Sequence, residues 1–214
     1  KDSTGDLNFN TSGGGGFGGQ TMKFHEPKPR DITPDQQTWL RNHLNAFEST
    51  LYASDWLSRT GPNHYSAYID VDSFVDQHWI VEFTKQIDGY RLSNYMSKDR
   101  GGKIKMEPIW DWNLSFGNAD YLKGGYATGW YWTEQDEGIT SNEHIWLRRL
   151  IYGNANYPTS APNEPYPEGP GDPNFKQMII DRWSQLRTNI MHKDVVTARI
   201  DEMAALNEPQ VRDF

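Results

Sequence analysis

The sequence predicts an α+β domain that is mostly helical and contains one β-hairpin. Three observations support this: apolar residues recur at helical spacing in several segments, two short aromatic or β-branched segments flank a turn, and the chain is long enough to form a core. It has 214 residues, of which 36% are hydrophobic and nine are tryptophan. A chain of this length buries most of the surface that its unfolded form exposes.

The first predicted helix begins after Thr33. In the run Thr33-Pro34-Asp35-Gln36 a hydroxyl can cap the helix, proline takes the first helical position, and glutamine stands where it can complete a capping box. An apolar stripe at spacings of three and four residues then predicts a face that packs on a core. Its members are Trp39, Leu40, Leu44, Phe47 and Leu51.

A second helix is predicted to begin after Asp70, whose carboxylate can cap free backbone amides, and to end near Ile87. Residues 90–96 and 103–110 are predicted to form the hairpin, because residues 98–102 have turn chemistry. A short helix over residues 142–152, an irregular proline-rich segment at 158–173, a helix capped by Asp172 and a final helix over 194–206 complete the prediction.

Composition restricts the class of partner. With 21 Lys and Arg residues against 29 Asp and Glu residues, the net charge is −8, which disfavours binding to nucleic acid or to an anionic membrane. The chain contains no cysteine, so a metal ion would need oxygen or imidazole ligands. No apolar run has the length that a bilayer requires, and we therefore expect no membrane span.

The order of elements around Asp88 and Asp111 indicates phosphoryl-transfer chemistry. A helix is followed by a polar loop with Asp88, then by the hairpin, then by a loop with Asp111. Protein kinases place a base aspartate and a metal-binding asparagine before such a hairpin and a metal-binding aspartate after it. The reaction needs mainly positioning and charge stabilisation, which two carboxylates and an amide can provide.

Three segments resemble the CotH kinase family of bacterial and fungal envelope proteins: residues 70–95, the turn at residues 98–103, and the run at residues 110–114. The resemblance extends from Phe24 through Trp130 and more weakly to Leu206. It implies that residues 31–214 form the C-lobe of an atypical protein kinase, with a hairpin that carries the catalytic and metal loops. Residues 1–30 are then a flexible loop or the end of a preceding lobe.

The resemblance also implies roles for individual residues. Asp88 matches the catalytic aspartate and Asp111 the metal-binding aspartate. Asn94 is the expected second metal contact, with Ser93 as an alternative because kinase catalytic loops place asparagine five residues after the aspartate. Asn113 is a competing metal ligand.

Two cations flank Asp88 in the sequence. Lys85 and Arg91 are candidate cofactor-binding residues because either could neutralise phosphate charge, although a cation at a helix end is ordinarily solvated.

The expected function is ATP-dependent phosphorylation of a protein hydroxyl with Mg²⁺ or Mn²⁺. The protein substrate would be the protein itself or an envelope or coat protein, and the resemblance implies an extracytoplasmic location, either secreted or at the cell envelope. One alternative is a catalytically silent CotH-like module for envelope assembly, coat formation or adhesion. A second is a carbohydrate-active protein, suggested by abundant carboxylates and the aromatic run at residues 129–132.

Structural explanations compete with several of these assignments. Asp88 before a glycine is also typical of a turn, and Asp111 between two tryptophans could accept indole hydrogen bonds at the edge of a core. The aromatic run at residues 129–132 is more typical of a core than of a binding platform. The glycine-rich run at residues 13–19 lacks the Gly-Lys-Ser/Thr ending of a phosphate-binding loop, which favours a surface loop.

Overall fold

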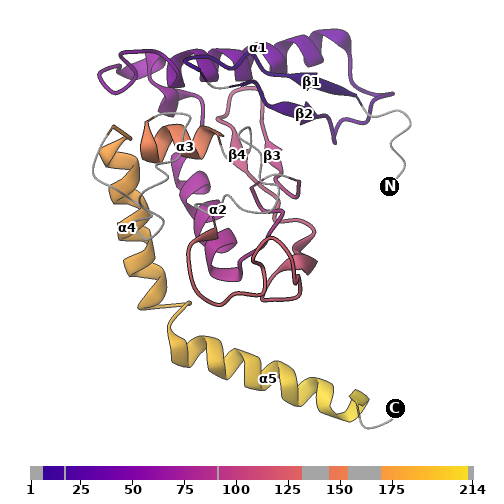
Figure 1. Cartoon of the computed structure of the whole chain (residues 1–214). Coiled ribbons are helices and arrows are strands. Elements are labelled where there is room, and N and C mark those ends of the chain that lie inside the picture. The colour runs from indigo at the N-terminus through magenta and orange to yellow at the C-terminus, as the bar shows by residue number, and fades with distance from the viewer. Residues whose placement is uncertain (1–6, 17, 91, 132–144, 154–169, 212–214) are drawn as a thin grey trace. The chain divides into compact units, whose positions relative to one another are not determined.

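A computed structural model describes residues 7–16, 18–90, 92–131, 145–153 and 170–211. These residues form five α-helices and two antiparallel sheets of two strands each, which confirms the predicted α+β class (Figure 1). The chain divides into two compact units, Lys1–Lys176 and Gln177–Phe214. Among the helices of the described residues, none combines the length and the apolar character that a membrane span requires.

The N-terminal segment contains a sheet where the sequence predicted a loop. Strands β1 (Asn8–Asn10) and β2 (Thr21–Lys23) pair with Phe9 opposite Met22. Figure 1 shows the pair beside helix α1 (Pro34–Leu51). The expectation of a loop was wrong for these strands because contacts with α1 hold the glycine-rich connection between them. The proposed boundary at residue 30 stays a prediction.

A buried glutamate on α1 makes those contacts. The side chain of Glu48 is fully buried, and its carboxylate accepts hydrogen bonds from the Thr11 hydroxyl at 2.6 Å and the Gly13 amide at 2.7 Å. The indole of Trp146 on helix α3 (Ile145–Tyr152) donates a third at 2.9 Å. Charged acceptors are costly to bury unless donors surround them, so these bonds fix the three segments together.

Helix α1 begins as predicted. Thr33 and Gln36 form both hydrogen bonds of the capping box, and Leu44, Phe47 and Leu51 are buried. Trp39 was wrongly assigned to the core, since 42% of its surface is exposed. Its ring instead contacts the ammonium group of Lys98, which lies 4.7 Å from the ring centroid.

Helix α2 (Val71–Thr84) begins with the predicted cap, in which Asp70 accepts from the amide of Ser73 at 3.2 Å. It ends three residues earlier than predicted because Lys85 takes a left-handed conformation, with φ of 50°.

The hairpin forms between strands β3 (Met96–Ser97) and β4 (Lys105–Met106), which are shorter than predicted. It is fastened to the start of α2, where the amide of Met106 donates to the Ser73 hydroxyl at 3.2 Å. This bond fixes strand β4 at the start of α2.

The C-terminal helices follow the predicted order. The predicted start of α3 at residues 141–142 and most of the proline-rich segment lie outside the described residues. Helix α4 (Pro173–Arg187) is capped by Asp172, which accepts from the amide of Asn174 at 2.8 Å. Helix α5 (Lys193–Val211) is longer than predicted.

Replacing Glu48 tests the role of the buried carboxylate. Glu48→Gln replaces one acceptor oxygen with an NH₂ group that faces hydrogen-bond donors. We therefore expect the free energy of unfolding to fall by about 1–3 kcal/mol, measured by urea denaturation. Asp201→Asn on the exposed surface of α5 is the control. A Glu48→Gln protein as stable as the parent would contradict the assigned role.

Candidate functional site

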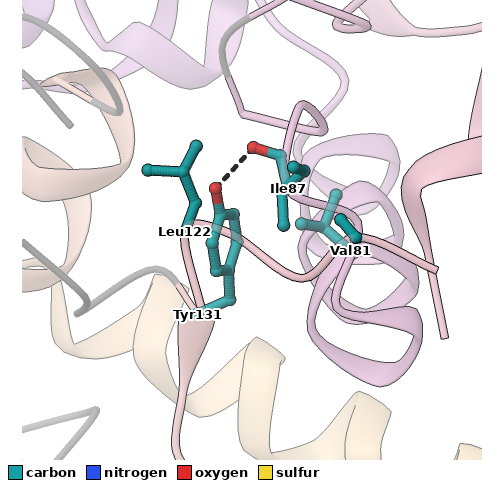
Figure 2. Packing of buried hydrophobic residues seen from close by; sticks show 5 residues of the cluster. Val81, Ile87, Leu122 and Tyr131 are labelled. Atoms are coloured by element: carbon teal, nitrogen blue, oxygen red, sulfur yellow. Dashed lines mark hydrogen bonds between the residues drawn. The ribbon is translucent and has the colours of Figure 1, made fainter. Parts of the chain in front are cut away.

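The loop with Asp88 rests on a small apolar core at the end of α2. Val81, Ile87, Ala119, Leu122 and Tyr131 are buried together. Figure 2 shows the hydroxyl of Tyr131 donating to the carbonyl of Ile87. The core thus holds the residue before Asp88 against the segment that follows the hairpin.

The positions of residues 129–131, part of the aromatic run, show whether that run belongs to the core. Tyr131 is fully buried and Trp130 makes an edge contact with Trp79, their ring centroids 5.8 Å apart. The prediction that this run belongs to the core is confirmed for Tyr131, while Trp132 lies outside the described residues.

Gly89 allows the loop to pass close to α2. A Cβ atom at this position would lie 2.5 Å from a methyl group of Val81, closer than real Cβ contacts. The carbonyl of Gly89 accepts from the side chain of Gln77 at 3.3 Å, and its amide donates to the carbonyl of Gln86 at 3.1 Å. The backbone after Asp88 is therefore bound both to α2, through Gln77, and to the chain that follows α2, through Gln86.

A single side chain joins the two candidate loops. Gln86 is fully buried, and its Oε1 atom accepts from the backbone amide of Asp88 at 3.1 Å. Its Nε2 atom donates to the backbone carbonyl of Asp111 at 2.8 Å. The catalytic and metal candidates, 23 positions apart in the printed sequence, are thus brought to the same glutamine amide.

A partly buried polar network holds the other end of the Asp88 loop. The Tyr90 hydroxyl lies 2.7 Å from His78 Nδ1 and 2.8 Å from Glu82 Oε1, and Glu82 Oε2 accepts from the amide of Tyr131 at 2.8 Å. A carboxylate only accepts, so the tyrosine hydrogen points to Glu82 and His78 Nδ1 carries its own hydrogen. Burial lowers the pKa of His78 to about 3, which keeps the ring neutral.

The Asp111 loop turns sharply and is bound to the end of α2. Asp111 has a φ of 60° and precedes a 3₁₀ turn, Trp112–Leu114. The indole of Trp112 donates to the Thr84 hydroxyl at 2.9 Å, and the amide of Phe116 donates to the Thr84 carbonyl at 2.6 Å. The Trp112 indole is thus directed to Thr84 instead of to the carboxylate of Asp111.

Asn113 contacts the candidate metal residue through its nitrogen. Its amide is oriented with Nδ2 toward Asp111, because that orientation gives hydrogen bonds of 3.0 Å to Asp111 Oδ1 and 3.2 Å to the Asp111 carbonyl. Asn118 in turn donates to the carbonyl of Asn113 at 2.7 Å. The arrangement favours Asn113 as a residue that orients the carboxylate over one that ligates metal.

Asn94 offers an oxygen suited to a cation. Its Oδ1 atom is buried and has no hydrogen-bond partner among the described residues, whereas Ser93 donates its amide to the carbonyl of Asp88 at 3.0 Å. Amide and carboxylate oxygens are ligands that Mg²⁺ accepts. The buried Oδ1 atom of Asn94 and the carboxylate of the exposed residue Asp111 are thus oxygen donors of the type that a divalent ion accepts.

The described residues contain no group of three or more His, Asp or Glu side chains that could hold a metal ion by themselves. Mg²⁺ sites in phosphoryl-transfer enzymes commonly use one or two carboxylates together with substrate phosphates.

The two candidate cations have different outcomes. Lys85 is 8% exposed, and its ammonium group donates to the carbonyl of Thr128 at 2.7 Å, a contact that favours a structural role. Arg91 lies outside the described residues.

Gln86 and the His78, Glu82 and Tyr90 network were not among the sequence candidates. Gln86 follows Lys85 near a helix end, where a polar residue is ordinary, so no feature of the sequence pointed to it. His78 and Glu82 lie on α2, which also carries apolar side chains, so their spacing indicates only burial, and Tyr90 lies in the loop after the helix.

The site defines an α+β protein with two linked acidic loops. Its elements are a helix, a loop with Asp88, a short hairpin and a loop with Asp111, and the buried side-chain amide of Gln86 joins the two loops. The chain belongs to the CotH kinase protein family, whose model matches residues 4–157 and so includes every candidate site residue. Comparisons with curated proteins and with solved structures gave no significant match.

Substituting Gln86 tests its connection of the loops. Gln86→Glu keeps an acceptor for the Asp88 amide but places a charged acceptor against the Asp111 carbonyl, so we expect a loss of about 2 kcal/mol or more in the free energy of unfolding. Gln86→Leu removes both bonds and should speed hydrogen exchange at the Asp88 amide. Gln37→Glu on α1 is the control; unchanged exchange at Asp88 in Gln86→Leu would refute the connection.

The pH dependence of stability tests the neutral state of His78. Its pKa falls from 6.5 when unfolded to about 3 when folded, so the unfolded chain binds an extra proton between these values. The contribution of neutral His78 to the free energy of unfolding is complete above pH 6.5. It is lost as the pH falls toward 3, at up to about 1.4 kcal/mol per pH unit. His78→Gln should lose this slope and the exposed-site variant His192→Gln should keep it; equal slopes in parent and His78→Gln would show that His78 is not buried as a neutral group.

Proposed function

We propose that this chain is the C-lobe of an ATP- and metal-dependent protein kinase of CotH type, which transfers the γ-phosphate of ATP to a protein hydroxyl. The observation that carries the proposal is the Gln86 side chain, which hydrogen-bonds the backbones of both Asp88 and Asp111. A kinase site needs a base and a metal-binding carboxylate at a fixed separation, and this amide can supply that constraint.

In this proposal Asp88 orients the acceptor hydroxyl and accepts its proton. Asp111 and Asn94 hold Mg²⁺ or Mn²⁺, which supplies charge neutralisation for the β- and γ-phosphates when bound. Asn113 fixes the orientation of the Asp111 carboxylate through its Nδ2 contact. The backbone bonds at Gln86, Gly89 and the carbonyl of Asp88 hold the loop in place before the substrate arrives.

The remaining assignments are part of the same proposal. Arg91 is the candidate cation for phosphate charge, since Lys85 is engaged by Thr128. The acceptor is a protein, either the kinase itself or an envelope or coat protein, in an extracytoplasmic compartment. The competing function is a catalytically silent family member that acts in assembly or adhesion, and ATP binding distinguishes the two.

The test is a calorimetric titration of the intact protein with Mg²⁺ and ATP, together with a phosphorylation assay. Asp111→Asn should weaken metal-dependent ATP binding at least about tenfold, because it removes the charge that opposes the cation. Asp88→Asn should leave ATP affinity nearly unchanged and lower phosphorylation by about 10²–10⁴-fold. Asp120→Asn, an exposed carboxylate in the same segment, is the matched control.

Each outcome of this titration separates the two functions. ATP binding that needs metal and is lost in Asp111→Asn supports the kinase. No metal-dependent ATP binding by the intact parent protein supports the silent module and refutes the kinase assignment.

A further inference from the structure

Two strongly exposed apolar side chains are attached to the loop that carries Asp88. Leu92 is 65% exposed and Phe116 is 70% exposed, and we call them the apolar pair. The backbone amide of Leu92 donates to the carbonyl of Asp88 at 3.0 Å. Phe116 extends the apolar surface to the last turn of α2, because its ring meets that of Phe83 with the centroids 6.1 Å apart. Contiguous apolar surface of this kind commonly marks a place where another molecule binds.

Phe116 is also fixed beside the residues that lead into Asp88. The amide of Phe116 donates to the carbonyl of Thr84 at 2.6 Å, and the amide of Ile87 donates to the carbonyl of Leu114 at 3.4 Å. These two bonds place the chain before Phe116 next to the chain that ends at Asp88. Both members of the apolar pair are therefore held by backbone hydrogen bonds to the Asp88 loop or to the residues directly before it.

The backbone at Phe116 is strained. Phe116 has a φ of 52°, and Gly117 follows with a φ of 80°. The left-handed region is unfavourable for a bulky residue, whereas glycine and asparagine adopt it readily. Strained conformations persist where the surrounding structure imposes them, and they cluster at functional sites. The fold therefore keeps a large apolar ring exposed at a position where a small or polar residue would be more stable.

We propose that the apolar pair binds the acceptor polypeptide and selects an apolar side chain close to the hydroxyl that is phosphorylated. The inference rests on the proposed kinase function and adds the chemical class of the acceptor. In that function Asp88 orients the acceptor hydroxyl, so the acceptor residues that flank the hydroxyl pass over the surface beside Asp88. An apolar side chain that packs on Phe116 or Leu92 removes apolar surface from water on both partners, which favours the complex.

An apolar acceptor segment suits this surface better than a charged one does. The side chains of Phe83, Leu92 and Phe116 carry no charge. The cation of the same segment, Lys85, is buried and its ammonium group donates to the carbonyl of Thr128. A charged acceptor side chain placed against the three apolar side chains would lose hydration, and this loss disfavours its binding there.

The test measures which serine peptides the intact protein phosphorylates with Mg²⁺ and ATP. Each peptide mixture has a central serine, one flanking position fixed as phenylalanine, leucine, lysine, aspartate or alanine, and mixed residues at all other positions. For at least one flanking position, phenylalanine and leucine should be preferred over lysine and aspartate by about tenfold or more, because burial of one large apolar side chain contributes an effect of this order.

Variants assign the preference to the apolar pair. Phe116→Asn removes the ring and suits the left-handed backbone, so the protein should remain folded. It should raise the KM for the preferred peptides about tenfold and leave kcat and ATP affinity unchanged. Phe116→Tyr should keep most of the preference, and Leu92→Ser should weaken it. Ile190→Ser is the matched control, since Ile190 is 64% exposed and belongs to the second compact unit; its KM should equal that of the parent.

The outcomes separate this inference from the kinase proposal. If the parent protein shows no metal-dependent ATP binding, the kinase proposal and the acceptor surface both fail. If the parent binds ATP with metal but phosphorylates apolar peptides no better than charged ones, or phosphorylates none, the acceptor surface alone is refuted. It is also refuted if Phe116→Asn keeps the preference, or if this variant weakens ATP binding instead of raising the KM for the peptide.

Discussion

The hydrogen bonds of the Gln86 amide are the constraint on which the candidate site depends. A fully buried amide must find a donor and an acceptor, and here the amide of Asp88 and the carbonyl of Asp111 provide them. Loss of either bond leaves a polar group without compensation in a dry environment. Separating the Asp88 loop from the Asp111 loop therefore costs free energy, because the buried Gln86 amide would lose a hydrogen bond.

The surrounding structure supports this amide. Helix α2 ends at Thr84 so that the chain can turn, and Thr84 itself binds the Asp111 loop through its hydroxyl and its carbonyl. The hydroxyl of Tyr131 binds the carbonyl of Ile87, and the hydroxyl of Tyr90 binds Glu82 on α2. Gly89 lacks the Cβ atom that would clash with Val81. The end of α2, the packing at Gly89 and these hydrogen bonds thus all stabilise the same loop conformation.

Sequence reasoning succeeded where the determinants are local. The caps at Thr33 and Asp70 depend on residues three positions apart, and both helices begin as expected. It failed where distant segments decide the outcome, as for Trp39, whose partner Lys98 lies on the hairpin, and for the strands that Glu48 holds. Asp88 and Asp111 could be chosen from their order and family resemblance, whereas Gln86 could not, because its role exists only after the hairpin closes.

The hydrogen bonds of Glu48 also have a consequence for folding. They join residues separated by 37 positions on one side and 98 on the other, so they form only after large loops have closed. Loop closure of this kind slows folding and makes the last contacts depend on all earlier ones. The glycine-rich segment and α3, near opposite ends of the region matched by the family model, are therefore coupled through one carboxylate: loosening either should weaken the attachment of the other, and they should open as one cooperative unit.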